Sequence, residues 1–161
     1  PYEGITASCN SLTDLSSEDN VVLTQDKVDF LDEVATSVDD TALIANCPFD
    51  GSAFSFALDG LNVYSRRYEG FESNSETILS AEIRGSLDLL ECSPDFSADM
   101  REAGFKYVLI LDRDFERMKL FNELFHEEDW EGFYSVNDST PGFEVVLSEG
   151  DMRLYEIVYP E

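Results

Sequence analysis

Positively charged side chains are scarce in this chain of 161 residues, which has 10 Lys and Arg against 35 Asp and Glu. The formal net charge is -25. Proteins that bind DNA or RNA need Lys and Arg to neutralise phosphates, so this composition excludes nucleic-acid binding. An anionic membrane leaflet would also repel such a surface. The acidity indicates a solvated, soluble surface, with adaptation to high salt or weak divalent-cation binding as alternatives.

Patterns typical of metal and redox sites are also missing. The three cysteines, Cys9, Cys47 and Cys92, are too far apart for a C-x-x-C motif. A zinc site is not expected because His126 is the only histidine, and no loop has the ligand spacing of a calcium hand. We therefore predict no metal and no cofactor. Outside the cytoplasm, one disulfide and one leftover thiol are expected; Cys47–Cys92 is the favoured pair because Cys9 lies in a polar segment.

Long apolar runs and start signals are absent as well. No run of about 18 apolar residues is present, so no segment of this sequence is expected to span a membrane. The chain begins at Pro1 without a signal peptide, so we expect it to be a piece cut from a longer protein. Residues 1–20 are polar and read as a leader or linker. With 43% hydrophobic residues, residues 21–161 are predicted to form a single domain with one core.

Apolar periodicity predicts alternating helices and strands. Helices are expected over residues 25–38, 52–58, 76–90, 93–104 and 115–125. Strands are expected over residues 41–45, 61–64, 105–111, 143–147 and 153–158. The first two strands and the helix between them form a β-α-β unit, whose strands are parallel by default. The sequence thus predicts an α/β fold, a three-layer sandwich with a mainly parallel sheet of about five strands and a C-terminal antiparallel hairpin.

The turn after the first predicted strand is the best candidate for a ligand site. Asn46, Asp50, Gly51 and Ser52 lie there. In open α/β sheets, ligands gather at the carboxyl ends of strands, and a helix N-terminus offers free N–H groups to an anion. The alternative is structural: Asp50 or Ser52 caps the following helix, and Gly51 permits close packing. No G-x-G-x-x-G or Walker motif supports nucleotide binding.

Two further candidates follow other predicted strands. Arg66 and Arg67 follow the second strand and could bind a carboxylate or phosphate, or could pair with neighbouring acids. Asp112 follows the strand at 105–111 and could contact a cation or a sugar. Its alternative role is to cap the next helix, a role that Asp114 could also fill.

Residues 126–142 are expected to form a polar loop that also contains aromatic residues. Trp130 and Tyr134 lie beside the acidic run 127–129, which suggests an aromatic platform for a glycan with carboxylates next to it. Paired carboxylates also serve glycosidases, although adjacent acids are expected by chance in so acidic a chain. No G-x-S-x-G elbow is present to supply a nucleophile for a catalytic triad.

Three patches of the chain resemble known membrane proteins. Residues 42–53 (ALIANCPFDGSA) and 56–60 (FALDG) look like the I-x-N-x-P-x-D-G-S-A…Y-A-L-x-G stretch of an uncharacterised actinobacterial family of multi-spanning membrane proteins. Residues 100–109 (MREAGFKYVL) are similar to the L-G-V-R-Y-V-L strand entry of that family. Residues 141–146 and 153–158 resemble the closing hairpin of soluble C-terminal domains in integral-membrane glycosyltransferases of the C superfold. The chain departs from the pattern at Cys47 and Phe49 in the turn, and at Phe56, where Tyr is common.

The resemblance implies an extracytoplasmic domain, membrane-anchored through segments absent here, in a glycosyltransferase-like parent of the cell envelope. The catalytic acid of such transferases lies in membrane-proximal loops, so the domain is expected to be an accessory or binding domain without catalysis of its own. Its expected partners are its own transmembrane region and a glycan or lipid-linked sugar. The alternatives are a secreted surface module that binds a glycan or small ligand, and a carboxylate-based hydrolase.

Overall fold

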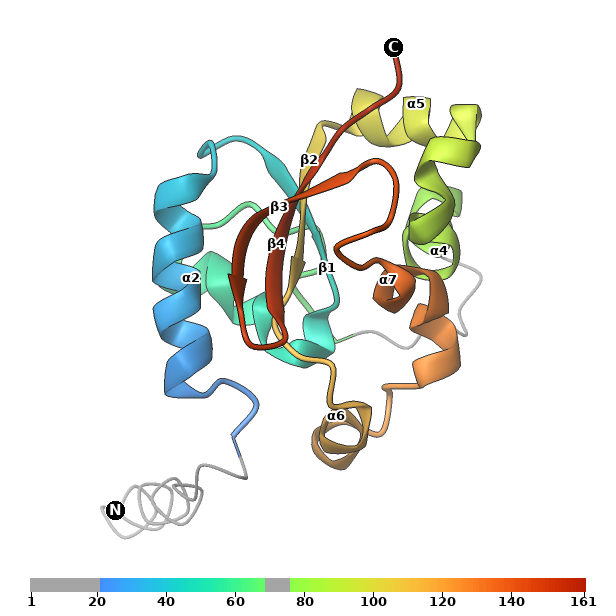
Figure 1. Cartoon of the computed structure of the whole chain (residues 1–161). Helices are drawn as coiled ribbons and strands as arrows, with labels where there is room; N and C mark the ends of the chain where they lie inside the picture. The colour runs from blue at the N-terminus through green and yellow to red at the C-terminus, as the bar shows by residue number, and fades with distance from the viewer. Residues whose placement is uncertain (1–20, 69–75) are drawn as a thin grey trace, which may run out of the picture.

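The computed structural model describes residues 21–68 and 76–161 of the chain (Figure 1). The predicted leader over residues 1–20, which includes Cys9, lies outside the described residues. The helices are α2 (Gln25–Ser37), α3 (Ser55–Asp59), α4 (Ile78–Ser86), α5 (Pro94–Ala103), α6 (Phe115–Phe121) and α7 (Glu131–Ser135). The strands are β1 (Leu43–Asn46), β2 (Phe105–Ile110), β3 (Phe143–Glu149) and β4 (Met152–Ile157).

The four strands form one mixed sheet in the order β1-β2-β4-β3. Only β1 and β2 are parallel; β4 pairs antiparallel with both β2 and β3. The predicted, mainly parallel sheet of about five strands is therefore wrong. Residues 61–64, predicted to be a strand, form only an isolated bridge between Val63 and Ile44. Ser65, which follows, bonds through its backbone N–H and carbonyl to the side chain of Asn46, and this turns the backbone away from the sheet.

The position of the C-terminal hairpin explains why the sheet is not mainly parallel. It is present, but its second strand lies inside the sheet, next to β2. β4 is buried at four of its six positions, whereas β3 is buried only at Phe143. An interior strand has both faces covered and an edge strand does not, so burial places β4 inside and β3 at the edge. With β4 beside β2, a second parallel partner for β2 is excluded.

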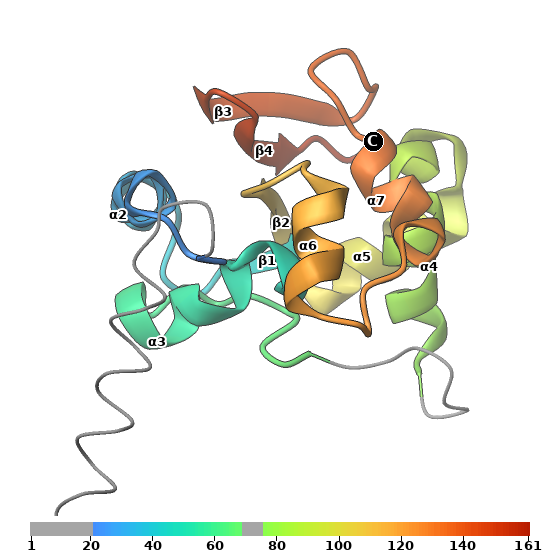
Figure 2. The same ribbon diagram turned by 90° about the horizontal axis from the view of Figure 1, so that it is seen from below.

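Side chains alternate along β2 and divide the core into two parts, one on each face of the sheet. Tyr107 and Leu109 belong to the part that includes Leu31 and Val34 of α2. Val108 and its neighbours on the same face belong to the larger part, which includes residues of α4, α5 and α7. Figures 1 and 2 show α2 on one side of the sheet and the other long helices on the opposite side.

Residues 126–142, predicted to be a loop, contain a 3-10 turn (Glu127–Trp130) and helix α7. Gly132 of α7 lies against the backbone of α4: a Cβ atom on Gly132 would lie 2.2 Å from the carbonyl carbon of Gly85. Two helices can approach this closely only where no side chain stands between them. The glycine is thus what allows this segment to pack as a helix. Among the described residues, no helix has the length and apolar content needed to cross a bilayer.

Candidate functional site

The candidate site begins at the turn after β1, where Asp50 is fully buried. Gly51 has φ 100°, a left-handed conformation that reverses the chain after Asp50. One carboxylate oxygen of Asp50 accepts the backbone N–H of Ser52 at 2.9 Å, and the other accepts the backbone N–H of Leu111 at 2.8 Å. Asp50 therefore fastens the turn after β1 to the end of β2.

Asn46 and Ser52, two other predicted ligand-binding residues, also use their polar atoms within the protein. The Asn46 amide donates to the Ser52 hydroxyl at 2.8 Å and to the Ser65 carbonyl at 2.9 Å, and its oxygen accepts the Ser65 N–H at 2.8 Å. The Ser52 hydroxyl donates to the carbonyl of Cys47 at 2.8 Å. The structure thus brings Asn46, Asp50, Gly51 and Ser52 together as a hydrogen-bonded support for the turn.

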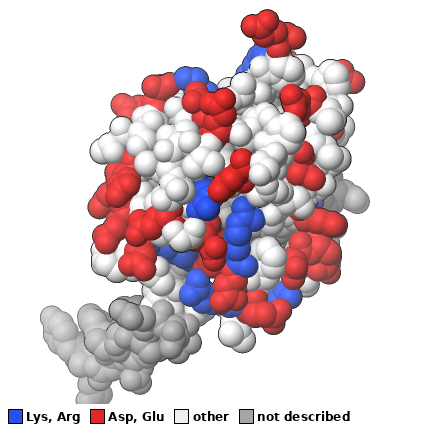
Figure 3. All heavy atoms as spheres, viewed as in Figure 1, with Lys and Arg blue, Asp and Glu red and all other residues white. Residues whose placement is uncertain are grey.

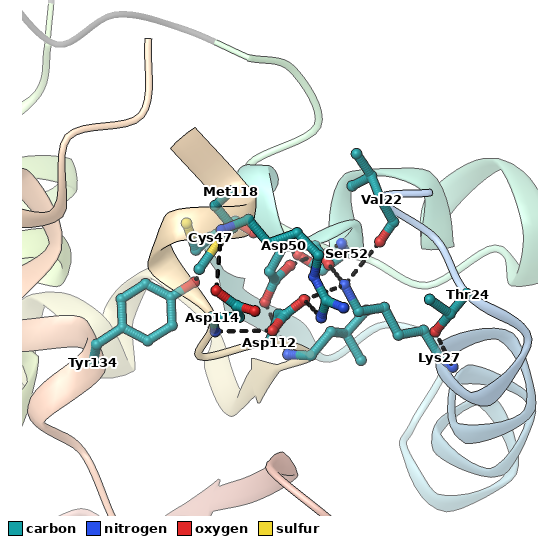
Figure 4. A network of polar contacts seen from close by, with 12 residues as sticks. Val22, Thr24, Lys27, Cys47, Asp50, Ser52, Asp112, Asp114, Met118 and Tyr134 are labelled. Atoms are coloured by element: carbon teal, nitrogen blue, oxygen red, sulfur yellow. Dashed lines mark hydrogen bonds and ion pairs between the residues drawn. The ribbon is translucent and has the colours of Figure 1, made fainter. Parts of the chain in front are cut away.

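Lys27 of α2 is at the centre of the site, and the sequence analysis did not single it out. Its ammonium group donates to the Val22 carbonyl at 2.7 Å, the Asp50 carbonyl at 2.8 Å and the Asp112 carboxylate at 2.7 Å (Figure 4). These three bonds use all three protons of the ammonium group. The sequence did contain a signal for this residue, because Lys27 lies among the apolar residues of the first helix. A lysine buried there needs a charged or polar partner.

Asp112 connects the buried cluster to the surface. One oxygen accepts the backbone N–H of Asp114 at 2.9 Å, and the other accepts from both Lys27 and Arg117. Asp114, and not Asp112, caps α6, because its side chain accepts the backbone N–H of Arg117. Asp112 is therefore the shared anion of a cluster with two cations.

The two carboxyl groups have pKa values that shift in opposite directions. Burial raises the pKa of Asp50 from 3.8 to about 6, against the opposing effects of the Leu111 N–H and the Lys27 charge. For Asp112, burial alone would raise the pKa, but its bonds to Lys27, Asp114 and Arg117 together hold it below 3.8. The same cluster thus contains one carboxyl whose pKa is raised and one whose pKa is lowered.

A hollow of about 640 Å³ opens beside this cluster. Its walls come from the first turn of α2, the end of β2, α6 and the β3–β4 turn, with lining residues that include Lys27, Asp112, Arg117, Asp26 and Asp151. Arg117 is the donor that a ligand can reach: its side chain is 30% exposed, and only its Nη2 atom has a bonding partner within the described residues. The hollow therefore presents both a hydrogen-bond donor and exposed carboxylates.

Arg66 lies apart from the lining of this hollow. Its guanidinium donates to the Val63 carbonyl at 3.1 Å and to the side chain of Asn62 at 2.9 Å, and it stacks over the ring of Phe56. The predicted strand-end site is therefore only partly assembled: Asn46, Asp50, Ser52 and Asp112 are brought together, and Arg66 is not.

The predicted glycan platform is placed in the core. Trp130 is 2% exposed and Tyr134 is 8% exposed, so most of each ring is covered, although both residues line a hollow of about 420 Å³ with Glu127, Glu128 and Glu131. Trp130 packs edge-on against Phe49 and Phe133, and the Tyr134 hydroxyl donates to the sulfur of Met118. Sequence reasoning missed this burial because the surrounding residues are acidic.

The favoured disulfide is absent from the structure. Cys47 and Cys92 are both free thiols, the first buried and the second exposed. Burial raises the pKa of the Cys47 thiol well above its ordinary value. Within residues 21–68 and 76–161, no three His, Cys, Asp or Glu side chains are grouped so that they could hold a metal ion.

Comparison with known proteins gives one match. No curated protein and no solved structure matches the chain. A family model described as "Family of unknown function (DUF6541)" matches residues 2–159, which is nearly the whole chain. The chain therefore belongs to this family of unknown function.

Proposed function

We propose that the chain is a non-catalytic, extracytoplasmic domain of a larger, glycosyltransferase-like membrane protein, and that it binds a sugar-containing ligand in the hollow beside Arg117. One observation supports the proposal. The carboxylates of Asp50 and Asp112 are hydrogen-bonded within the protein, and the hollow beside them still offers free donors and acceptors. The resemblance of residues 40–158 to membrane-protein sequences supports the nature of the parent protein.

The bonds of the two buried acids support a non-catalytic role. A general acid or base must come within hydrogen-bond reach of the proton that it transfers. Both oxygens of Asp50 accept backbone N–H groups, and Asp50 does not line the hollow. Asp112 reaches the hollow, but its oxygens accept from Asp114, Lys27 and Arg117. Asp50 is fully buried, and the contacts of Asp112 hold its pKa below 3.8, which makes it a weak base.

The chemistry of the hollow suits a ligand rich in hydroxyl groups. Asp26, Glu149 and Asp151 in its lining would repel a simple anion. Lys27 and Arg117 would repel a metal ion in the same way. A sugar hydroxyl both donates and accepts, so it can bond a carboxylate and a guanidinium at once. A glycan or the sugar of a lipid-linked sugar is the ligand class that fits this mixture.

The proposal is tested by titrating the purified chain with a panel of oligosaccharides while recording amide NMR spectra. We expect shifts at Asp26, Arg117 and Asp151, about tenfold weaker binding for Arg117→Gln, and unchanged binding for Arg101→Gln. Arg101 is the matched control because its guanidinium contacts Pro160 and Tyr159, outside the hollow. Absence of any shift at the hollow would refute the binding proposal, and turnover of a glycan would refute the non-catalytic one.

A carboxylate-based hydrolase is the second candidate. It is favoured by the opposite pKa shifts of Asp50 and Asp112, since acid–base pairs in hydrolases have separated pKa values. Glycosidase activity that is lost in both Asp50→Asn and Asp112→Asn, with both variants folded, would support it over the first proposal.

A further inference from the structure

Exposed apolar side chains lie on helix α3 and directly before it; other apolar side chains, such as Ile78 and Leu120, are exposed elsewhere on the molecule. Ser55 points inward and is fully buried, while Phe54, Phe56 and Leu58 are 43%, 47% and 55% exposed. Tyr68, 38% exposed, lies next to them. Figure 2 shows α3 beside α2 at the edge of the molecule, and Figure 3 shows acidic side chains over much of another face. Exposed apolar patches on soluble surfaces mark interaction sites.

These side chains are held in place by contacts with one another. The rings of Phe54 and Tyr68 meet edge to face with centroids 6.4 Å apart, and Tyr68 also stacks on buried Phe49 at 5.5 Å. The guanidinium of Arg66 lies 3.9 Å above the centre of the Phe56 ring. We call Phe54, Phe56, Leu58, Arg66 and Tyr68 the α3 face. It is an ordered surface that combines apolar side chains with a cation.

The charge of the α3 face is opposite to that of the molecule. Arg66 and Arg67 are adjacent and exposed, although the chain has only 10 Lys and Arg. Asp59 is the acidic residue of α3; it is partly buried, and burial together with the nearby Asp32 raises its pKa. Asp32 belongs to α2, which also carries the exposed acids Asp26, Asp29 and Glu33. The acids near α3 therefore belong to α2 and to the end of α3, while the guanidinium of Arg66 lies over the Phe56 ring.

We infer that the α3 face rests on the surface of a lipid bilayer, with Phe54, Phe56 and Leu58 at the boundary between headgroups and acyl chains. Aromatic residues and arginine are enriched at this depth, because the ring is apolar while the guanidinium meets lipid phosphate. The cation stacked on Phe56 already has this arrangement. The inference rests on the proposed anchoring of the parent protein, which would hold the domain close to the membrane.

The charges of the chain favour a bilayer over a second copy of the same chain. Two chains of net charge -25 repel one another unless salt screens them. The same charge favours zwitterionic over anionic lipid, because an anionic leaflet repels the remainder of the domain. The expected partner is therefore a bilayer rich in phosphatidylcholine or another neutral lipid.

The test is flotation of the full chain with phosphatidylcholine vesicles over a range of lipid concentrations. The first variant combines Phe54→Ser, Phe56→Ser and Leu58→Ser. The matched control combines Ile78→Ser, Leu89→Ser and Leu120→Ser, which lie outside the α3 face; Ile78 and Leu120 are more exposed than any of the three, and Leu89 is about as exposed as Leu58. We expect the first variant to lose about tenfold or more in partitioning and the control to lose less than about twofold.

Each outcome supports or overturns the inference. Equal losses in the two variants, or no partitioning of the unmodified chain at any lipid concentration, would overturn it. So would a dimer in light scattering that the first variant alone dissociates, because the face would then bind a second copy. Urea midpoints for all three proteins show that they are folded. Sugar titration of the same samples reports separately on the hollow, so a failure of the ligand proposal remains distinguishable.

Discussion

The buried carboxyl of Asp50 predicts that the stability of the chain falls as pH rises. Its pKa of about 6 in the folded chain lies above its ordinary value of 3.8. Between these values the folded chain retains a proton that the unfolded chain releases, so unfolding releases protons and stability falls as pH rises. The contribution is fully present below pH 3.8 and is lost as pH rises through about 6. The difference corresponds to roughly 3 kcal/mol, at 1.36 kcal/mol for each pH unit.

The assay is urea unfolding of the unmodified chain and Asp50→Asn between pH 4 and pH 7.5. Titration of the other acids is common to both proteins, so the difference between their unfolding free energies isolates Asp50. Between pH 4 and pH 7.5, we expect the unmodified chain to lose roughly 2.5 kcal/mol relative to the variant, because part of the full effect is already lost at pH 4. Asp112→Asn is the matched control: the pKa of Asp112 is lowered below 3.8, so its contribution changes only at lower pH and its difference should stay nearly constant between pH 4 and pH 7.5. If the unmodified chain gained stability relative to Asp50→Asn as pH rose, the N–H groups and Lys27 would outweigh burial, and the reasoning would be refuted.

Two other predictions concern packing and thiol exposure. Gly132→Ala is expected to destabilise the chain by about 3 kcal/mol or more, because its Cβ would lie 2.2 Å from the backbone of Gly85. Gly85→Ala, with open space around its Cβ, should be neutral or stabilising. Thermal melts compare the two variants, and equal effects would show that the two helices do not touch there. In native alkylation followed by mass spectrometry, exposed Cys92 should react within minutes and buried Cys47 only after denaturation; protection of both would indicate a disulfide between them.

The sequence predicted local features well where a single segment contained the signal. The first helix was expected over residues 25–38, and α2 spans Gln25–Ser37. The apolar run at 105–111 was expected to be a strand, and β2 is buried at five of its six positions. The turn at Asn46 to Ser52 was predicted to be a ligand site, and its polar side chains do lie together in the structure. Its role in a ligand site stays a prediction, because all of its described bonds support the turn.

Other features could not be derived, because their causes lie far apart in the chain. Lys27 and Asp112 are separated by 85 residues, and no local pattern connects them. The position of β4 beside β2 depends on which of the two hairpin strands is more apolar on both faces, not on either strand alone. The burial of Trp130 depends on the close approach of α7 to α4 that Gly132 permits.

The sequence by itself determined the charge of the molecule and most of the helices and strands, since these follow from composition and short-range periodicity. Only the tertiary structure decided the strand order, the burial of Lys27 and the arrangement of the α3 face. Strand pairing and burial minimise the free energy of the whole chain, and contacts between distant segments contribute to that minimum as much as local preferences do.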